Sequence, residues 1–186
     1  MTEPAGMYGE DEESVTRLQK KKDVRGLLQL LESRHLNTRW RAAEALGSLG
    51  DRRAVDGLIK ALGDPYVDVS WLAARSLGQI RDRRAVEPLI IALSGDDPWL
   101  RRGACEGLGR IRDQRAVKPL IRALGDSKRK VRVAAVRAIG QIGDHSAEDA
   151  ISALLNDPEE QVRHAASGAL KMLESARPLQ VMQPQL

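Results

Sequence analysis

The chain has 186 residues, of which 42% are hydrophobic and 30% charged, so it is long enough for one domain with a sizeable core and has the composition of an ordinary soluble protein. Its formal net charge of +4 permits nucleic acid as a partner without arguing for it, and the single cysteine, Cys105, excludes an internal disulfide. No transmembrane helix is expected, because no stretch of about 18 apolar residues occurs, and residues 1–14 lack the features of a signal peptide, so a cytoplasmic location is the default expectation.

The two ends of the chain differ in composition from the part between them. Residues 1–13 are rich in Asp and Glu and are expected to form an acidic flexible tail. In residues 14–20, Val15 and Leu18 are in register with apolar positions of later helices, which predicts a partial N-terminal capping helix. Residues 176–186 are expected to form a second flexible tail, so the folded part is predicted to span residues 14–175.

Between the tails the sequence repeats itself. The string Asp-Arg-Arg-Ala-Val at residues 51–55 recurs at 82–86, returns with one substitution at 113–117 and decays at 144–148, so each step is 31 residues. One apolar column in this register reads Leu27, Leu58, Leu89, Leu120 and Ile151. A fixed period of this kind indicates a repeat architecture. We therefore predict five repeats, at about residues 20–50, 51–81, 82–112, 113–143 and 144–174.

Each repeat is predicted to contain a first and a second helix joined by a turn. Val55, Leu58 and Leu62 show helical spacing, and Asp64-Pro65 then breaks the chain. A second stretch of helical spacing follows in every unit. The repeat is thus a helix–turn–helix unit.

Two glycine positions of the second helix predict local geometry. Gly50 stands where a second helix ends and can form a left-handed cap, whereas Arg81 and Arg112 replace it in two repeats, so their turns are expected to close differently. Inside the second helix, one column reads Gly47, Gly78, Gly109 and Gly140. Because a glycine inside a helix costs roughly 0.5–1 kcal/mol relative to alanine, this column predicts that a neighbouring helix approaches closely.

One motif resembles a known family. Val131-Arg132, Ala135, Ile139-Gly140 and Ile142-Gly143-Asp144 resemble the short HEAT-like repeats of the phycobilisome-lyase type. The resemblance covers about residues 20–174 and implies an all-α, right-handed α-solenoid of five helix–turn–helix HEAT-like repeats. That family includes bilin lyase subunits and engineered binders, so the fold does not determine the function. The related iron enzyme deoxyhypusine hydroxylase uses paired His-Glu motifs, and this chain has no His-Glu dipeptide, so that activity is rejected.

The resemblance also implies a structural ladder of ion pairs that ties neighbouring repeats together. An arginine recurs directly after the apolar residue that opens the second helix, and an aspartate recurs six residues before the arginine position. The arginines are Arg39, Arg101, Arg132 and Arg163, and the aspartates are Asp64, Asp126 and Asp157. Ser70 interrupts the ladder in the second repeat. A phosphate-binding row of arginines is the alternative, but the regular Asp partners favour the structural role.

The outward columns of the second helices are the candidate binding surface. In consensus proteins that this chain resembles, they form a concave face, and all three tryptophans of the chain fall in them. Exposed Trp flanked by Arg is typical of interface hot spots. The predicted partner-binding residues are Trp40, Trp71, Trp99, Arg41, Leu72, Arg75, Arg102, Glu106, Arg110 and Arg137. The alternative is that Trp40 and Trp71 pack on each other and shield the solenoid.

The sequence favours a binding protein over an enzyme. It contains no Ser–His–Asp set, phosphate-binding loop or metal-ligand cluster, so no catalytic residue, metal or cofactor is predicted. We expect a non-enzymatic scaffold or adaptor that binds an acidic protein partner and no membrane. One alternative is an auxiliary subunit or chaperone of a bilin-type cofactor-attachment enzyme. Another is nucleic-acid binding along an arginine-lined groove, against which Glu44, Asp68 and Glu106 on the same face argue.

Overall fold

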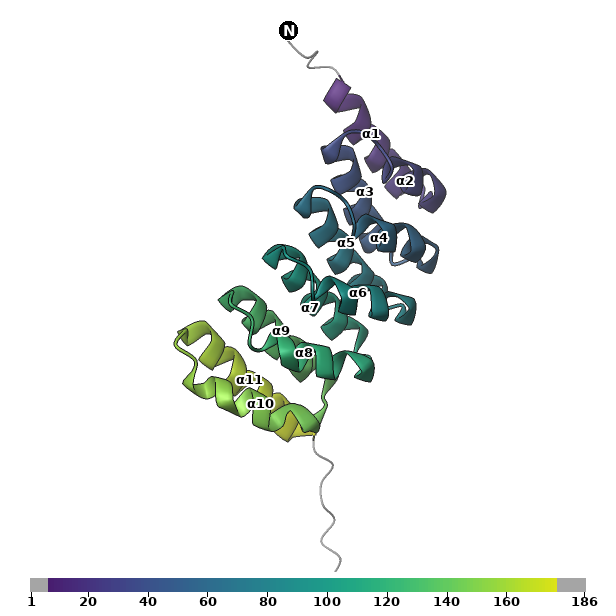
Figure 1. The fold of residues 1–186 in the computed structure, drawn as a ribbon. Coiled ribbons are helices and arrows are strands. Elements are labelled where there is room, and N and C mark those ends of the chain that lie inside the picture. The colour runs from purple at the N-terminus through teal and green to yellow at the C-terminus, as the bar shows by residue number, and fades with distance from the viewer. Residues whose placement is uncertain (1–6, 177–186) are drawn as a thin grey trace, which may run out of the picture.

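The computed structural model describes residues 7–176, which fold into α-helices joined by turns and short 3₁₀ segments (Figure 1). Long helices form one layer: α1 (Met7–Lys20), α3 (Leu36–Leu49), α5 (Val67–Ile80), α7 (Pro98–Ile111), α9 (Arg129–Ile142) and α11 (Glu160–Ala176). Short helices form the other layer: α2 (Val24–Leu30), α4 (Val55–Ala61), α6 (Val86–Ala92), α8 (Val117–Ala123) and α10 (Glu148–Ala153). From α2 onward, each short helix is the first helix of a repeat, and the long helix after it is the second.

The two layers stack into one solenoid. Each long helix packs on the next long helix, from α1 against α3 to α9 against α11, and each short helix packs on the long helix of its own repeat. The repeats follow one another in chain order along the molecule (Figure 1). This is the all-α solenoid that the 31-residue period predicts. None of the described helices is long and apolar enough to span a membrane.

The N-terminal helix is longer than expected. The sequence predicts a capping helix that begins at Ser14, whereas α1 begins at Met7 and so includes part of the segment assigned to the acidic tail. Its packing against α3 matches the register of Val15, which is buried. The rest of that tail, residues 1–6, and residues 177–186 of the C-terminal tail lie outside the described residues.

The core is built from aliphatic side chains, as the absence of Phe requires. The first-helix column Leu27, Leu58, Leu89, Leu120 and Ile151 is fully buried, with 0% of each residue exposed. Burial of each such side chain contributes about 1.5–3 kcal/mol to folding. Cys105 is also fully buried, and burial raises the pKa of its thiol, so it behaves as a small hydrophobic residue.

The Asp of the repeated Asp-Arg-Arg-Ala string caps a 3₁₀ turn that leads into the first helix. The Asp51 carboxylate accepts a hydrogen bond from the backbone N–H of Arg53 at 2.8 Å, and Asp82, Asp113 and Asp144 do the same one repeat later each time. Each carboxylate satisfies a backbone donor that the helix itself cannot pair. The motif is therefore repeated because every inter-repeat turn needs this cap.

The expectation that Arg81 and Arg112 close their turns differently is wrong. Both adopt the same left-handed conformation as Gly50, with φ of 58° and 59° against 68°. The backbone N–H of Arg81 donates to the Leu77 carbonyl, and that of Arg112 donates to the Leu108 carbonyl. The turn geometry is thus fixed by helix stacking, and the two arginines accept a backbone conformation that glycine adopts at lower cost.

The glycine column of the second helix marks close approach between neighbouring long helices, as the sequence predicts. A β-carbon at Gly78 on α5 would lie 2.6 Å from the Cα of Gly107 on α7, and one at Gly109 would lie 2.8 Å from the Cα of Ala138 on α9. Real β-carbons are essentially never found so close to a backbone atom. Only glycine permits this stacking distance without displacing a helix.

Ion pairs join neighbouring repeats at the turns within repeats. The guanidinium of Arg39 binds both carboxylate oxygens of Asp64, at 2.6 and 3.1 Å. Arg101 binds Asp126 in the same way at 2.7 and 3.1 Å, and Arg132 binds Asp157 at 2.9 Å to each oxygen. Each of these arginines also donates to a carbonyl of its own turn, as does Arg163 in the last repeat.

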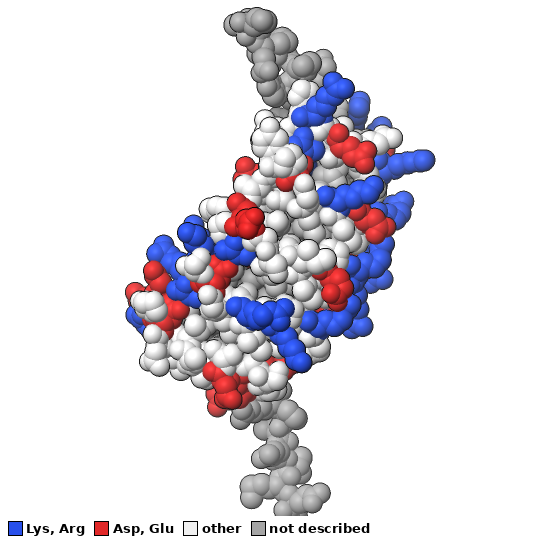
Figure 2. Space-filling model, viewed as in Figure 1, with Lys and Arg blue, Asp and Glu red and all other residues white. Residues whose placement is uncertain are grey.

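A second set of arginines joins the inter-repeat turns. Arg84 donates to the carbonyl of Arg52 one repeat earlier and pairs with Asp56, and Arg115 repeats the arrangement with Arg83 and Glu87. This set was not predicted from the sequence, although it consists of the second Arg of the repeated string. Lys and Arg side chains gather along the edge of the molecule where these turns lie (Figure 2).

Candidate functional site

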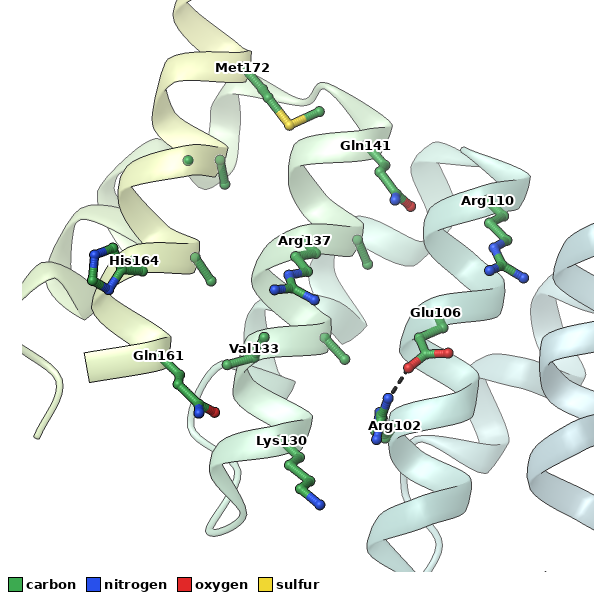
Figure 3. A pocket seen from close by; sticks show the side chains of 15 residues that line it. Arg102, Glu106, Arg110, Lys130, Val133, Arg137, Gln141, Gln161, His164 and Met172 are labelled. Carbon is green, nitrogen blue, oxygen red and sulfur yellow. Dashed lines mark hydrogen bonds and ion pairs between the residues drawn. The ribbon is translucent and has the colours of Figure 1, made fainter. Parts of the chain in front are cut away.

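The candidate site is a groove on the second-helix layer, between the last three long helices. It encloses about 820 Å³ and is open to solvent (Figure 3). We call it the α7–α11 groove. Its lining residues are Arg102, Glu106, Arg110, Lys130, Val133, Ala134, Arg137, Ala138, Gln141, Gln161, His164, Ala165, Gly168, Ala169 and Met172.

The groove carries an excess of positive charge. Its one lining carboxylate, Glu106, lies 2.8 Å from the Arg102 guanidinium and 3.3 Å from Arg75, so two arginines neutralise it. Among the described residues, no carboxylate pairs with Arg110, Lys130 or Arg137. Arg110 is partly buried, whereas Lys130 and Arg137 are exposed, and the uncompensated charges of all three give the groove a positive potential that attracts an anionic ligand.

The three tryptophans occupy different environments. Trp40 and Trp71 are half-buried and pack against the core, and the Arg75 guanidinium lies 4.7 Å from the centre of the Trp71 ring. Trp99 is 45% exposed. Trp99 is therefore the tryptophan most accessible to a partner.

Arg75 connects the Trp71 region to the groove. Its Nε atom is 3.3 Å from a Glu106 oxygen, but the direction is poor for a hydrogen bond, and this atom has no hydrogen-bond partner in the described structure. The Arg75–Glu106 contact is therefore an ion pair, and the Arg75 guanidinium is positioned by the Trp71 ring. Trp71 Nε1 is likewise buried without a hydrogen-bond partner in the described structure.

A second hollow, which we call the Trp99 cavity, adjoins the groove and shares Arg102 and Lys130 with it. It encloses about 350 Å³. It is lined by Pro98, Trp99, Arg102, Ser127, Lys128, Arg129, Lys130, Val131, Arg132 and Glu159. The Lys130 ammonium lies 4.7 Å and the Arg102 guanidinium 5.7 Å from the centre of the Trp99 ring.

The comparisons with known proteins identify the family. A family model described as HEAT repeats matches residues 24–93, 86–171 and 123–186. The chain belongs to the HEAT repeat family. No curated protein sequence matches it.

Solved structures agree with this assignment. The complex of CpcE and CpcF of phycocyanin lyase from Nostoc sp. PCC7120 matches with a TM-score of 0.73 and 30% identity, over 82% of this chain. This chain spans only 65% of the matched lyase chain. An engineered protein (TM-score 0.63, 22% identity, 87% of this chain and 83% of that chain) shares the fold alone. So does a designed armadillo repeat protein in complex with the peptide (KR)4 (TM-score 0.62, 18% identity, 86% and 85%).

The HEAT repeat structure brings together only part of the predicted partner-binding set. Arg102, Glu106, Arg110 and Arg137 line the α7–α11 groove. The other predicted residues, which are Trp40, Trp71, Trp99, Arg41, Leu72 and Arg75, do not line it, and Trp99 lines the adjoining cavity. The inclusion of Leu72 in a binding surface is wrong, because only 5% of it is exposed. Its position lies between adjacent second helices, as the buried Gly103 at the same position of the next repeat shows.

The position of the groove follows from side-chain size. In the second repeat two neighbouring columns of the second helix carry Trp71 and Leu72, which fill the space between helices. In the last two repeats the Leu72 column carries Ala134 and Ala165, and the Trp71 column carries Val133 and then His164. On α11, Gly168 has nothing within 4 Å of its β-carbon position. Small residues in consecutive repeats therefore hollow out this half of the face.

Several groove residues were missed by sequence reasoning. These residues lie in the outward columns but were not in the predicted set; they are Lys130, Gln141, Gln161, His164 and Met172. The small residues around them in consecutive repeats could have predicted a hollow at this place. The run Lys128-Arg129-Lys130, which lines the Trp99 cavity, was a second signal visible in the sequence.

No metal site is evident in the described part of the chain, where no three His, Cys, Asp or Glu side chains are grouped to hold an ion. Two of the three histidines make other contacts. The His145 Nδ1 atom lies 2.6 Å from a Glu148 carboxylate oxygen, and His164 lies on the wall of the groove. The α7–α11 groove thus offers charged groups, side-chain amides and a small apolar floor.

Proposed function

We propose that this HEAT repeat protein is a non-enzymatic scaffold that binds an extended acidic segment of a protein partner in the α7–α11 groove. The observation that carries the proposal is the set of cations, Arg110, Lys130 and Arg137, that line the groove without a carboxylate partner among the described residues. Each can form a charge-assisted hydrogen bond with an Asp or Glu side chain of the partner. The acidic partner expected from the sequence is thereby assigned to a specific surface, the α7–α11 groove.

The uncharged lining supports a peptide rather than a compact ligand. Gln141 and Gln161 are exposed and offer both hydrogen-bond donors and acceptors, which the backbone of an extended segment requires. Met172 is 48% exposed and adapts to different apolar side chains. The groove crosses three consecutive long helices, so a segment of several residues can contact all of them.

The proposal is tested with fluorescein-labelled (Asp-Glu)4 peptide and the opposite peptide (Lys-Arg)4. Fluorescence anisotropy is expected to show binding of the acidic peptide only. Its affinity should fall as salt rises, because the Debye length shrinks from about 10 Å at 0.1 M to about 3 Å at 1 M. Absence of binding at low salt, or equal binding of both peptides, would overturn the proposal. Tighter binding of a DNA duplex than of the peptide would favour nucleic acid instead.

A matched pair of variants separates the groove from overall charge. Arg110→Glu with Arg137→Glu reverses two groove cations, whereas Lys118→Glu with Arg122→Glu reverses two exposed cations on α8. The groove variant should weaken the acidic peptide by about tenfold or more, the factor that 1.4 kcal/mol represents. The α8 variant has the same net charge and should lose only the weak long-range part of the electrostatic attraction for the peptide. Equal losses would mean that net charge alone attracts the peptide.

The likeness to the phycocyanin lyase complex favours a second candidate function, as an auxiliary subunit or chaperone of a bilin-type cofactor-attachment enzyme. A linear tetrapyrrole is the probe for this function. Addition of the pigment should quench the fluorescence of Trp99, which is exposed beside the cations of the groove. The quenching should be smaller in Trp99→Leu than in the wild type. Wild-type fluorescence that does not change on addition of the pigment would count against this function.

A further inference from the structure

The Trp99 cavity has charges that the described structure does not neutralise. Five cationic side chains line it, and three of them pair with carboxylates: Arg102 with Glu106, Arg129 with Glu159 and Arg132 with Asp157. The two others, Lys128 and Lys130, have no carboxylate partner among the described residues. The cavity therefore presents at least two positive charges in excess, because Arg102 shares Glu106 with Arg75.

Trp99 holds part of this charge in place without cancelling it. The Lys130 ammonium lies 4.7 Å from the ring centre, within the distance of about 6 Å at which the ring quadrupole attracts a cation. A carboxylate in the same position would fix the ammonium but remove its charge. The aromatic ring orders Lys130 and leaves it free to bind an anion, which favours preorganised binding over an accidental surface charge.

We propose that the Trp99 cavity binds a phosphate monoester carried by the acidic segment, so this inference rests on the proposed function. A phosphorylated side chain carries about −1.5 to −2 charge at pH 7 and three strong acceptor oxygens. This charge matches the two uncompensated lysines, whereas a single carboxylate would match one. Arg102 and Lys130 line both hollows, so a segment in the groove can place a phosphorylated residue in the cavity.

The size of the cavity is consistent with this ligand. About 350 Å³ exceeds what one carboxylate fills and leaves room for a phosphate group with its side chain. Pro98, which is partly exposed, can contact the methylene or methyl groups of phosphoserine or phosphothreonine. Arg and Lys clusters of this kind are the general means by which proteins recognise phosphorylated segments.

The test uses fluorescein-labelled acidic peptides that differ at one terminal residue, which is serine, phosphoserine or glutamate, with the variable residue placed at either end. We expect the phosphoserine peptide to bind about tenfold more tightly than the serine peptide at low salt, the factor that one additional charge-assisted hydrogen bond supplies. The preference should grow between about pH 5 and pH 7, because the second phosphate pKa is about 6. The glutamate peptide should show no such dependence on pH.

Two variants lie in the Trp99 cavity and outside the groove. Lys128→Ala removes one uncompensated charge, and Trp99→Leu removes the ring that orders Lys130. Each should abolish most of the preference for phosphoserine. Lys128→Ala should leave the affinity for the serine peptide unchanged, because Lys128 does not line the groove. Lys118→Ala on α8 is the matched control and should retain the preference, and circular dichroism verifies that all variants are folded.

The outcomes distinguish this inference from the proposed function. If the serine and phosphoserine peptides bind equally, or if the preference survives in both Lys128→Ala and Trp99→Leu, the cavity proposal is overturned. The groove variant Arg110→Glu with Arg137→Glu should weaken both peptides while it preserves their ratio. A phosphoserine peptide with neutral flanking residues tests the cavity by itself. If this peptide binds and Lys128→Ala abolishes the binding, the cavity proposal is supported even where acidic peptides without phosphate do not bind. Inorganic phosphate that displaces the peptide only weakly would show that the cavity recognises a phosphate group carried by a peptide.

Discussion

Single arginines at the turns within repeats bridge neighbouring units. The Arg132 guanidinium pairs with Asp157 of the next repeat and also donates to the Asp126 carbonyl of its own turn. Only 12% of the Arg132 side chain and 6% of the Asp157 side chain are exposed. Removal of one partner therefore leaves a buried charge without its counter-ion, which costs more than the pair itself contributes.

The first prediction compares a buried arginine with an exposed one. Arg132→Ala should lower the free energy of unfolding by about 3 kcal/mol or more, because Asp157 loses its partner in a site that water barely reaches. Arg84→Ala should cost much less, because that side chain is 49% exposed and water screens its ion pairs. Urea denaturation of both variants measures the difference. Equal costs for the two would show that the ladder at these turns does not stabilise the stack.

The second prediction concerns acid. The hydrogen bonds from Arg132 to Asp157 and from Arg115 to Asp113 hold the pKa of each carboxyl below its ordinary value, and Asp51 beside Arg53 has a pKa of about 2. Groups with a depressed folded pKa stabilise the protein above their unfolded pKa of about 3.9 and lose that contribution as pH falls through the folded value.

The urea midpoint should therefore be flat above about pH 5 and fall steadily below about pH 4. In Arg132→Ala the fall should be smaller, because Asp157 no longer has its hydrogen-bonded partner. A midpoint that stays constant down to about pH 2.5, or that rises on acidification, would contradict the assignment of these pairs.

Among the elements, the α5–α7 joint differs from the α3–α5, α7–α9 and α9–α11 joints. It lacks the Arg–Asp pair that they share, because Ser70 replaces the arginine and Gly95 stands at the position of Asp64, Asp126 and Asp157. At the same joint two glycines face each other, Gly78 on α5 and Gly107 on α7. Close backbone packing at this joint takes the place of the ion pair that holds the others together.

The third prediction compares two glycines in second helices. Gly78→Ala should destabilise the protein by about 1–3 kcal/mol, because the new methyl group would overlap the Gly107 backbone and force the helices apart. Gly168→Ala on α11 should stabilise it by about 0.5–1 kcal/mol, because no atom lies within 4 Å and alanine favours a helix. Thermal unfolding measures both. A stabilising effect of Gly78→Ala would show that α5 and α7 are not closely packed.

At the scale of the whole molecule, the sequence was sufficient to predict the repeat period, the two-helix unit and the buried columns. These features depend on local periodicity, which every copy repeats. The location of the groove was not predicted, because it depends on the combined space that small residues such as Ala134, Ala165 and Gly168 leave between stacked helices. The buried state of Leu72 was missed for the same reason, since its column lies between helices rather than outward. The left-handed Arg81 was missed because stacking overrides the residue's own preference.

The most direct test of the central claim is an NMR titration of the ¹⁵N-labelled protein with (Asp-Glu)4 peptide, in which the backbone amide signals report the surface that is contacted. We expect the largest shifts on α7, α9 and α11 around Arg110, Arg137 and Met172, and small shifts on α4, α6 and α8. Largest shifts at the inter-repeat turns around Arg52 and Arg83, which are also exposed and basic, would contradict it.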